Sequence, residues 1–344
     1  MSTPVIDDPS SKPTEMRRGV GPRVKGVAQT VLTRPSAAIF VILAVVIVIF
    51  SALAPGTFTT VSNARSICTD ASILVVIAVA QMLVIVAAGI DLSNGSVLVF
   101  SGVVSAKIMT SIGGSGVGPS LVGLVVAVAC GLAWGMVNGF LTAYWRIPAF
   151  VVTLGTFGAA LGLAYILSGG LDIQSVPSGL TEFGIGRVLG IPNLVIVAAC
   201  VAAVFGVLLH MTRFGRHTYG IGSNAEAARR ASINVNRHLV AIYALAGGLT
   251  GFAGFLSLAR FGTTTLNGHA TDNLQAVTAV VIGGTSLFGG SGSVIGSVAG
   301  VFIPTVLQNG FVVIGVVPYW QQVTVGAVLV VAVYLDQLRR DRNR

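Results

Sequence analysis

Polar side chains that could bind a solute are scattered through a chain that is otherwise strongly apolar. Such side chains need hydrogen-bonding partners, because burying an unpaired polar group costs free energy. They could join neighbouring helices, or they could line a path for a hydroxyl-rich solute. The candidate path-lining residues are Gln81, Asp91, Ser93, Thr153, Thr156, Gln275, Gln308 and Asn309. Both interpretations stay open, and Pro304 favours path lining for Gln308 and Asn309 because a proline loosens its helix.

Two charged residues accompany the apolar stretches. Asp91 follows an apolar run and precedes Leu92-Ser93-Asn94-Gly95. Aspartate is a favourable helix N-cap, so we expect Asp91 to cap the next helix. Lys107 lies toward the end of an apolar stretch, where its aliphatic stem lets the ammonium group reach the membrane interface. Neither residue therefore requires a role in coupling transport to an ion.

Residue types that carry enzymatic chemistry form no recognisable set. The three lysines, Lys12, Lys25 and Lys107, lie outside any GxxxxGK[ST] pattern, so we expect no P-loop and no ATP bound by this chain. The four histidines lack metal-ligand spacing, so no metal site is predicted. No nucleophile lies beside a general base. The sequence therefore predicts a non-catalytic protein, and a membrane-embedded enzyme is a disfavoured hypothesis.

A short segment within the polar stretch 211–237 has the features of a surface helix. A capping asparagine opens it, alanines favour the helix, and charged side chains project from it. Its members are Asn224, Ala225, Glu226, Ala227, Ala228, Arg229, Arg230 and, at the end, Ile233. This helix could dock into a groove of a partner protein, or it could be an ordinary amphipathic connector.

The elements that must position these residues are membrane spans. Of 344 residues, 54% are hydrophobic and 9% are charged, whereas soluble domains carry about 25% charged residues. Apolar stretches of about 18 residues or more recur, which is the length of a membrane-spanning helix. The predicted spans are 37–54, 72–90, 95–112, 118–142, 149–168, 188–210, 238–258, 273–289, 292–313 and 318–336. The predicted fold is an all-α polytopic membrane protein with about ten transmembrane helices, of which 95–112 and 273–289 could be broken or re-entrant.

The distribution of basic residues predicts the sidedness of the chain. If the N-terminus is cytoplasmic and ten helices alternate, 16 Lys and Arg residues lie inside, and only Arg65, Arg187 and Arg260 lie outside. This bias is the positive-inside pattern of a cell-membrane protein with both termini in the cytoplasm, so the net charge of +9 needs no nucleic-acid partner. We expect a disordered cytoplasmic tail over 1–35, a transmembrane domain over 36–336 and a cytoplasmic tail over 337–344.

Glycine patterns suggest close helix packing and a weak internal sequence repeat, which is called the sequence echo below. The ladders Gly131-x3-Gly135-x3-Gly139 and Gly292-x3-Gly296-x3-Gly300 would let helices approach closely. The pattern that begins at Gln81 and ends at Gly95-Ser96-Val97 is echoed from Gln275 to Gly292-Ser293-Val294. Internal repeats are common in transporters.

Four motifs carry a resemblance to a known family. They are Ala87 to Val97, similar to "GIDLSVGS"; Ile147 to Thr156, similar to "PPFIATLGT"; Gly220 to Arg229, similar to "AIGGNEEAARLSGI"; and Val281 to Gly290. Over about residues 70–336 the chain resembles the permease subunits of ABC importers for ribose, xylose and related monosaccharides. Two departures are Asn94, where Val is usual, and 231–234, which replaces the "SGI" step.

The resemblance implies a mechanism and a set of partners. Two permease subunits, identical or closely related, would form the path between them within the lipid membrane. A separate ABC ATPase would hold ATP and Mg, and an extracytoplasmic binding protein would deliver the sugar, with the outer loop 169–190 as a docking surface. Asn224 to Ile233 would correspond to the coupling helix that transmits ATPase closure.

Two other functional hypotheses remain at this stage. A secondary transporter would need no ATPase, and the coupling segment argues against it. An importer of the same type could instead carry a nucleoside, inositol, a furanone signal or a branched-chain amino acid, and the sequence does not choose among these substrates.

Overall fold

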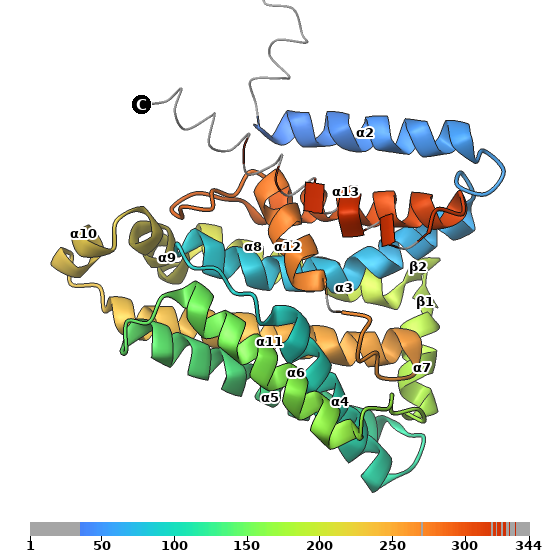
Figure 1. The fold of residues 1–344 in the computed structure, drawn as a ribbon, viewed down its shortest axis with the longest axis horizontal. Helices are drawn as coiled ribbons and strands as arrows, with labels where there is room; N and C mark the ends of the chain where they lie inside the picture. Colours follow the sequence, from blue (N-terminus) through green and yellow to red (C-terminus); the bar gives the residue numbers. More distant parts are fainter. Residues whose placement is uncertain are drawn as a thin grey trace, which may run out of the picture.

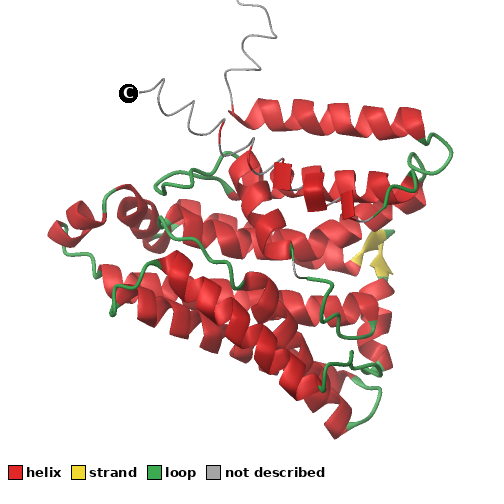
Figure 2. Ribbon diagram, in the orientation of Figure 1, coloured by secondary structure: helices red, strands yellow, loops and turns green. Residues whose placement is uncertain are grey.

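The computed structural model describes residues 35–269, 271–317 and scattered positions between 319 and 334. The regular secondary structure of this part is helical apart from one small hairpin, in which β1 (Arg187–Val188) pairs antiparallel with β2 (Ile191–Pro192) (Figure 2). Seven of its helices are long and apolar enough to cross a membrane: α3 (Val61–Val86), α4 (Asn94–Ile112), α5 (Val117–Ala143), α6 (Ala149–Ser168), α8 (Asn193–Met211), α11 (Val235–Phe261) and α13 (Val294–Val313). The predicted all-α polytopic class is confirmed.

Several predicted boundaries change in the structure. α3 begins at Val61 rather than at 72, because Thr60 caps it by accepting a hydrogen bond from the Asn63 N–H at 3.2 Å. α8 begins after the hairpin, at Asn193 rather than at 188. α4 is one unbroken helix of 19 residues, so the possibility that 95–112 is broken is wrong. The predicted tails, apart from Pro35, and most of the predicted span 318–336 lie outside the described residues.

The predicted span 273–289 is not a complete span. Its helix, α12 (Asp272–Ile282), has 11 residues, which at 1.5 Å per residue is about 16 Å, roughly half of the hydrocarbon thickness. Non-helical residues 262–269 and 271 precede it, and the α12–α13 turn, residues 283–293, follows it. The broken or re-entrant alternative is therefore the one that fits this segment.

The centre of the fold is a backbone-to-backbone contact between α5 and α11. The glycine ladder of α5 lies against Val240, Tyr243 and Gly247 of α11, and a Cβ atom at Gly139 would come within 2.8 Å of the Val240 Cα. The second ladder likewise packs α13 against α12 and its turn, where Gly296 faces Gly283. The prediction that both ladders allow close helix packing is confirmed.

A further helix, α2 (Pro35–Leu53), lies along α13 (Figure 1). Phe50 of α2 is buried against Gly310, and its ring contacts those of Phe58 and Phe311. This satellite cluster is separate from the main core, which is built largely on α3 and α11. α2 therefore forms an outer layer of the described fold.

The two ends of the helix bundle differ in their connections and charges. α9 (Arg213–Ser223) and α10 (Ala225–Arg230) lie at one end, and the β-hairpin and α7 (Ser178–Ile185) lie at the other (Figure 1). Arg187 is in that hairpin. The Arg65 guanidinium lies beside the hairpin turn, 3.9 Å from where a Cβ atom added at Gly190 would be, so these two predicted outer residues share one end. The basic residues of α9 and α10 occupy the other end. The direction in which the chain faces the membrane stays a prediction.

Candidate functional site

The α3–α4 turn, residues 87–93, holds a buried carboxylate. Asp91 is 1% exposed, and its Oδ1 accepts hydrogen bonds from the Ser93 N–H at 2.8 Å and from the Ser93 hydroxyl at 2.6 Å. Burial raises the pKa of this carboxyl group, which lies outside the helical spans, and the hydrogen bonds from Ser93 oppose the rise. The N-cap of α4 is Ser93. The expectation that Asp91 caps the helix is therefore wrong, because its side chain closes the turn two residues earlier.

A buried hydrogen-bond network joins this turn to four helices. Asn94 donates to the Gln81 side chain of α3 and accepts from the Thr250 hydroxyl of α11 at 3.0 Å. Asn138 of α5 donates to the Ser93 hydroxyl at 2.9 Å. Asn94, the departure from the family motif, is thus the centre of the network. Gln81 and Ser93 bond to neighbouring helices, as the helix-joining interpretation expects.

The two candidate threonines of α6 are also engaged with protein groups. Thr153 is fully buried and donates to the carbonyl oxygen of Ile90, in the α3–α4 turn, at 3.2 Å. Thr156 donates to the carbonyl oxygen of Val152 at 3.1 Å, one turn back in its own helix. Thr153 therefore joins α6 to the turn, whereas the Thr156 hydroxyl forms its hydrogen bond within its own helix.

A cavity of about 360 Å³ lies between α3, α12 and α13, beside the end of α11. Apolar side chains, among them Leu74 and Phe261, form part of its wall. Its polar lining residues are Asp70, His269, Asp272, Gln275, Thr305, Gln308 and Asn309. Of the eight candidate path-lining residues, the structure brings only Gln275, Gln308 and Asn309 to this cavity, and the other five belong to the α3–α4 turn and its neighbours.

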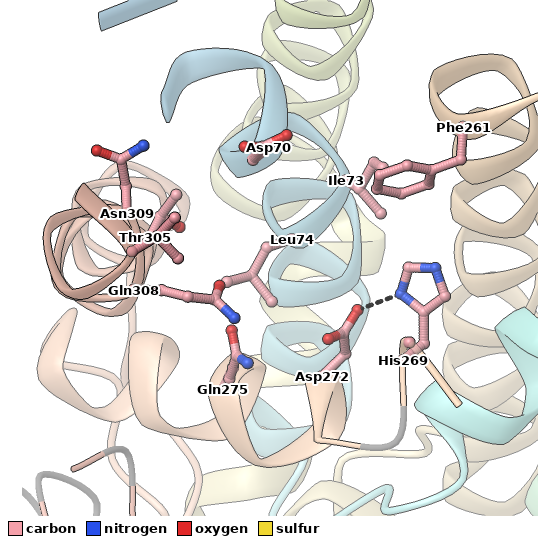
Figure 3. A pocket seen from close by; sticks show the side chains of 12 residues that line it. Asp70, Ile73, Leu74, Phe261, His269, Asp272, Gln275, Thr305, Gln308 and Asn309 are labelled. Carbon is pink, nitrogen blue, oxygen red and sulfur yellow. Dashed lines mark hydrogen bonds and ion pairs between the residues drawn. The ribbon is translucent and has the colours of Figure 1, made fainter. Parts of the chain in front are cut away.

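The three candidate amides in the cavity differ in whether protein groups occupy their hydrogen-bonding capacity. Asn309 and Asn63 exchange two side-chain hydrogen bonds, each of 3.0 Å, so Asn309 joins α13 to α3. Gln308 is exposed, has no hydrogen-bond partner within the described residues, and faces Gln275 of α12 (Figure 3). Gln275 donates to the Thr271 hydroxyl at 3.3 Å. The Gln308 amide and the oxygen of Gln275 therefore remain available to a ligand.

A hydrogen-bonded row of three side chains was not foreseen from the sequence. The Asp272 Oδ2 lies 2.7 Å from the His269 Nδ1, and the His269 Nε2 lies 2.7 Å from the Ser257 hydroxyl oxygen. His269 and Asp272 line the cavity, whereas Ser257 is 3% exposed within α11 and does not. A substrate in the cavity would meet the carboxylate rather than the serine. The polar run 262–273 between two apolar stretches was the signal that could have indicated this site.

Lys107 occupies a helix end. Its ammonium group donates to the carbonyl oxygen of Leu167 at 2.7 Å, next to the end of α6 at Ser168. A cation at a helix C-terminus interacts favourably with the unpaired carbonyl groups there. Lys107 thus has a structural partner in addition to its expected access to the interface.

α10 is a short helix with both ends satisfied. The Asn224 side chain caps it by accepting from the Ala227 N–H at 2.9 Å, as predicted. Beyond its last turn, the Ile233 N–H donates to the Ala228 carbonyl at 3.1 Å. Ala228 is buried against Ile221 and Val235. The helix is therefore held on its small-residue side.

The charged side of α10 faces outward. Glu226 lies 3.6 Å from the Arg229 guanidinium and 3.5 Å from that of Arg230, and all three side chains are more than half exposed. Exposed pairs of this kind add little stability. The charges therefore remain available to a partner protein.

The helix before α10 contacts the end of α3 and the α12–α13 turn. Gly222 of α9 packs directly on the carbonyl group of Val86 and on Gly290, and the Gly290 N–H donates to the Val86 oxygen at 2.9 Å. The Tyr219 hydroxyl donates to the carbonyl oxygen of Gly292 at 2.9 Å. α9 thus connects α10 to the end of α3 and to the α12–α13 turn, which are the two parts of the sequence echo.

Comparison with known proteins places the chain in a family. The family model described as "Branched-chain amino acid transport system / permease component" matches residues 63–333. The ribose import permease protein of Escherichia coli is 36% identical over 305 residues, which cover 87% of this chain and 92% of the relative.

Two further relatives from Escherichia coli match over similar lengths. The D-allose transport system permease protein is 34% identical, over 87% of this chain and 90% of its own. The galactose/methyl galactoside import permease protein is 37% identical, over 89% and 95%. No solved structure matches. The chain therefore belongs to this family of transport-system permease components, which confirms the resemblance that its four motifs indicated.

Proposed function

We propose that this chain is the permease subunit of an ATP-binding-cassette importer that carries a monosaccharide across the cell membrane. The relatives named for allose, ribose and galactose each align over about nine-tenths of their own length. The family description names branched-chain amino acids instead. Near-complete alignment with three sugar permeases is the more specific observation, so a sugar is the proposed substrate and a branched-chain amino acid is the second candidate.

The observation that carries the coupling part of this proposal is the position of α10. A six-residue helix with three exposed charged side chains lies at the end of the bundle, and its buried Ala228 fixes it to α9 and α11. Such a helix suits the groove of an ATPase subunit, which would bind ATP and Mg itself. We infer that Asn224 to Ile233 is the docking segment on the cytoplasmic side.

Motion of α10 would reach the membrane helices through α9. The contacts of Gly222 and Tyr219 with Val86, Gly290 and Gly292 involve backbone atoms, which cannot yield as a flexible side chain can. A rigid shift of α9 would therefore displace the end of α3 and the α12–α13 turn together. Such rigid-body motion is a common way to alternate between two states of a transporter.

The remaining partners follow from the importer assignment. We expect two permease subunits, identical or closely related, with the sugar path between them, and a binding protein that docks on the end with α7 and the hairpin. A secondary transporter fits less well, because it would have no use for an exposed docking helix such as α10. The two charged residues that the sequence offered for coupling to an ion also have structural partners. Lys107 bonds a helix-end carbonyl and Asp91 bonds Ser93.

The docking proposal is tested by charge reversal on α10. The double variant Arg229→Glu and Arg230→Glu keeps the helix exposed but inverts two charges, so co-purification with the ATPase subunit should fall steeply. Arg187→Glu is the matched control, because Arg187 is also exposed but lies at the opposite end of the bundle. Equal recovery of the ATPase with the double variant and the control would refute docking at α10.

A further inference from the structure

The cavity between α3, α12 and α13 has the polarity of a site for a neutral, hydroxyl-rich ligand. Asp272 uses Oδ2 to contact His269, and its Oδ1 has no hydrogen-bond partner within the described residues. The free Gln308 amide and the oxygen of Gln275 lie on the same cavity wall (Figure 3). The cavity therefore offers several acceptors and one amide donor to a molecule inside it.

The carboxylate of Asp272 is held in a fixed position. His269 is 6% exposed, and it bridges Asp272 to Ser257, which is 3% exposed on α11. The Gly95 backbone packs against the carbonyl of His269, and Asn273 donates to the Leu92 carbonyl at 3.0 Å. The start of α12 is thus anchored to both α11 and the α3–α4 turn, and a fixed polar group loses little entropy when a ligand binds.

The charges around the cavity disfavour a ligand that carries a carboxylate or a phosphate. Among the described residues that line it, none is Lys or Arg. The nearby Arg260 is engaged with Asp70 at 3.0 Å. An amino acid would need a cation for its carboxylate, whereas a sugar needs only hydrogen-bonding groups and an apolar surface, which Leu74 and Phe261 supply.

We propose that this cavity is a monosaccharide-binding site on the permease itself, in which the Asp272 carboxylate accepts hydrogen bonds from sugar hydroxyls. Gln275 and Gln308 complete the polar wall, and His269 is a positioning residue that orients Asp272. The volume of about 360 Å³ is near the lower end of the range for ligand pockets, about 300–1,000 Å³, and so suits one small sugar ring. This inference rests on the proposed function and assigns part of the substrate selectivity to the permease.

The test measures sugar binding by the purified permease alone, without ATPase or binding protein. Equilibrium dialysis with labelled D-ribose, D-allose and D-galactose should give saturable binding of at least one sugar. Asp272→Asn removes the charge at constant shape and should raise the Kd about tenfold or more, as expected for a hydrogen bond to a charged group. Gln308→Leu, at an exposed side chain that has no hydrogen-bond partner among the described residues, should also raise the Kd.

Glu182→Gln supplies the matched control. It makes the same carboxylate-to-amide change at an exposed side chain of α7, away from the cavity, and should leave the Kd unchanged. The proposal would be overturned if the Asp272→Asn and Gln308→Leu variants bound sugar with the wild-type Kd. It would also be overturned if the wild-type chain bound no sugar, or if L-leucine displaced the bound sugar. If ATP-driven sugar uptake with the binding protein still occurred, the importer function would stand without this site.

Discussion

Substitution of Gly222 by alanine tests whether α9 transmits motion from α10 to the membrane helices. A Cβ atom at this position would lie 2.7 Å from the Gly290 nitrogen and 2.9 Å from the Val86 carbonyl carbon. Both distances are shorter than the 3.4 Å at which ordinary contact begins, and the Val86 carbonyl oxygen would lie closer still, so the backbones must separate by more than about 0.7 Å. Because both neighbours are backbone atoms, relief requires α9 to move away from the end of α3 and from the α12–α13 turn.

The expected magnitude follows from this overpacking. Forcing an extra carbon into a closely packed contact costs about 1–3 kcal/mol, and weakening the hydrogen bond from Gly290 to Val86 adds about 1 kcal/mol. The total of about 2–4 kcal/mol corresponds to roughly a 30- to 700-fold shift in an equilibrium, because each 1.4 kcal/mol is about a factor of ten. We therefore expect Gly222→Ala to melt at lower temperature in detergent and to transport fewer sugar molecules per ATP hydrolysed in proteoliposomes.

Gly220 provides the control within the same helix. A Cβ atom there meets nothing within 4 Å, and alanine is the better helix former by about 1 kcal/mol. Gly220→Ala should keep the melting temperature and the coupling ratio at or above their wild-type values. If Gly222→Ala matched Gly220→Ala in both measurements, the argument that α9 transmits motion through backbone contacts would be refuted.

Three further predictions concern the turn, the helix contact and the cavity. Asp91→Ala leaves the buried Ser93 donors unpaired and should lower the free energy of unfolding by about 1–3 kcal/mol, whereas Asp91→Asn keeps an acceptor and should cost less in the same thermal unfolding assay. Gly135→Leu should lower the melting temperature by forcing α5 away from α11, since its Cβ would lie 2.8 Å from the carbonyl carbon of Tyr243. The control Gly158→Leu should not, because a Cβ at Gly158 meets nothing within 4 Å. Equal melting temperatures of the two variants would contradict this prediction. Gln308→Leu should slow sugar uptake without lowering the free energy of unfolding. Thr153→Val should lower the free energy of unfolding by about 1 kcal/mol and leave the KM for sugar unchanged. The opposite pattern would place Thr153, not Gln308, on the path.

The helical architecture was predictable because long apolar stretches and packed glycines have direct physical causes. The predicted span at 149–168 coincides with α6, and the capped helix at Asn224 is present. The start of α3 was missed because its first turns carry polar residues such as Arg65 and Asp70, which lower the local hydropathy. Apolar length alone also counted 273–289 as a span, although its glycine-rich second half forms a turn after α12.

The candidate site was only partly predictable, because polarity marks a residue without naming its partner. Gln308 and Asn309 are neighbours on α13, yet Asn309 is paired with Asn63, whereas the Gln308 amide has no partner in the described part of the chain. Ser257 and His269 meet only because the chain turns back between α11 and α12. Such contacts depend on the tertiary arrangement of the helices, which cannot be read from the residue types and spacing of a single sequence.

The central claim is that this chain works with an ATPase to import a sugar, and reconstitution tests it most directly. The permease would be co-expressed with candidate ATPase and binding-protein genes from its own genomic neighbourhood and placed in proteoliposomes. We predict that one monosaccharide, delivered by the binding protein, raises ATP hydrolysis and accumulates inside. Absence of any associated ATPase, together with sugar uptake driven by an ion gradient, would contradict the account and favour a secondary transporter.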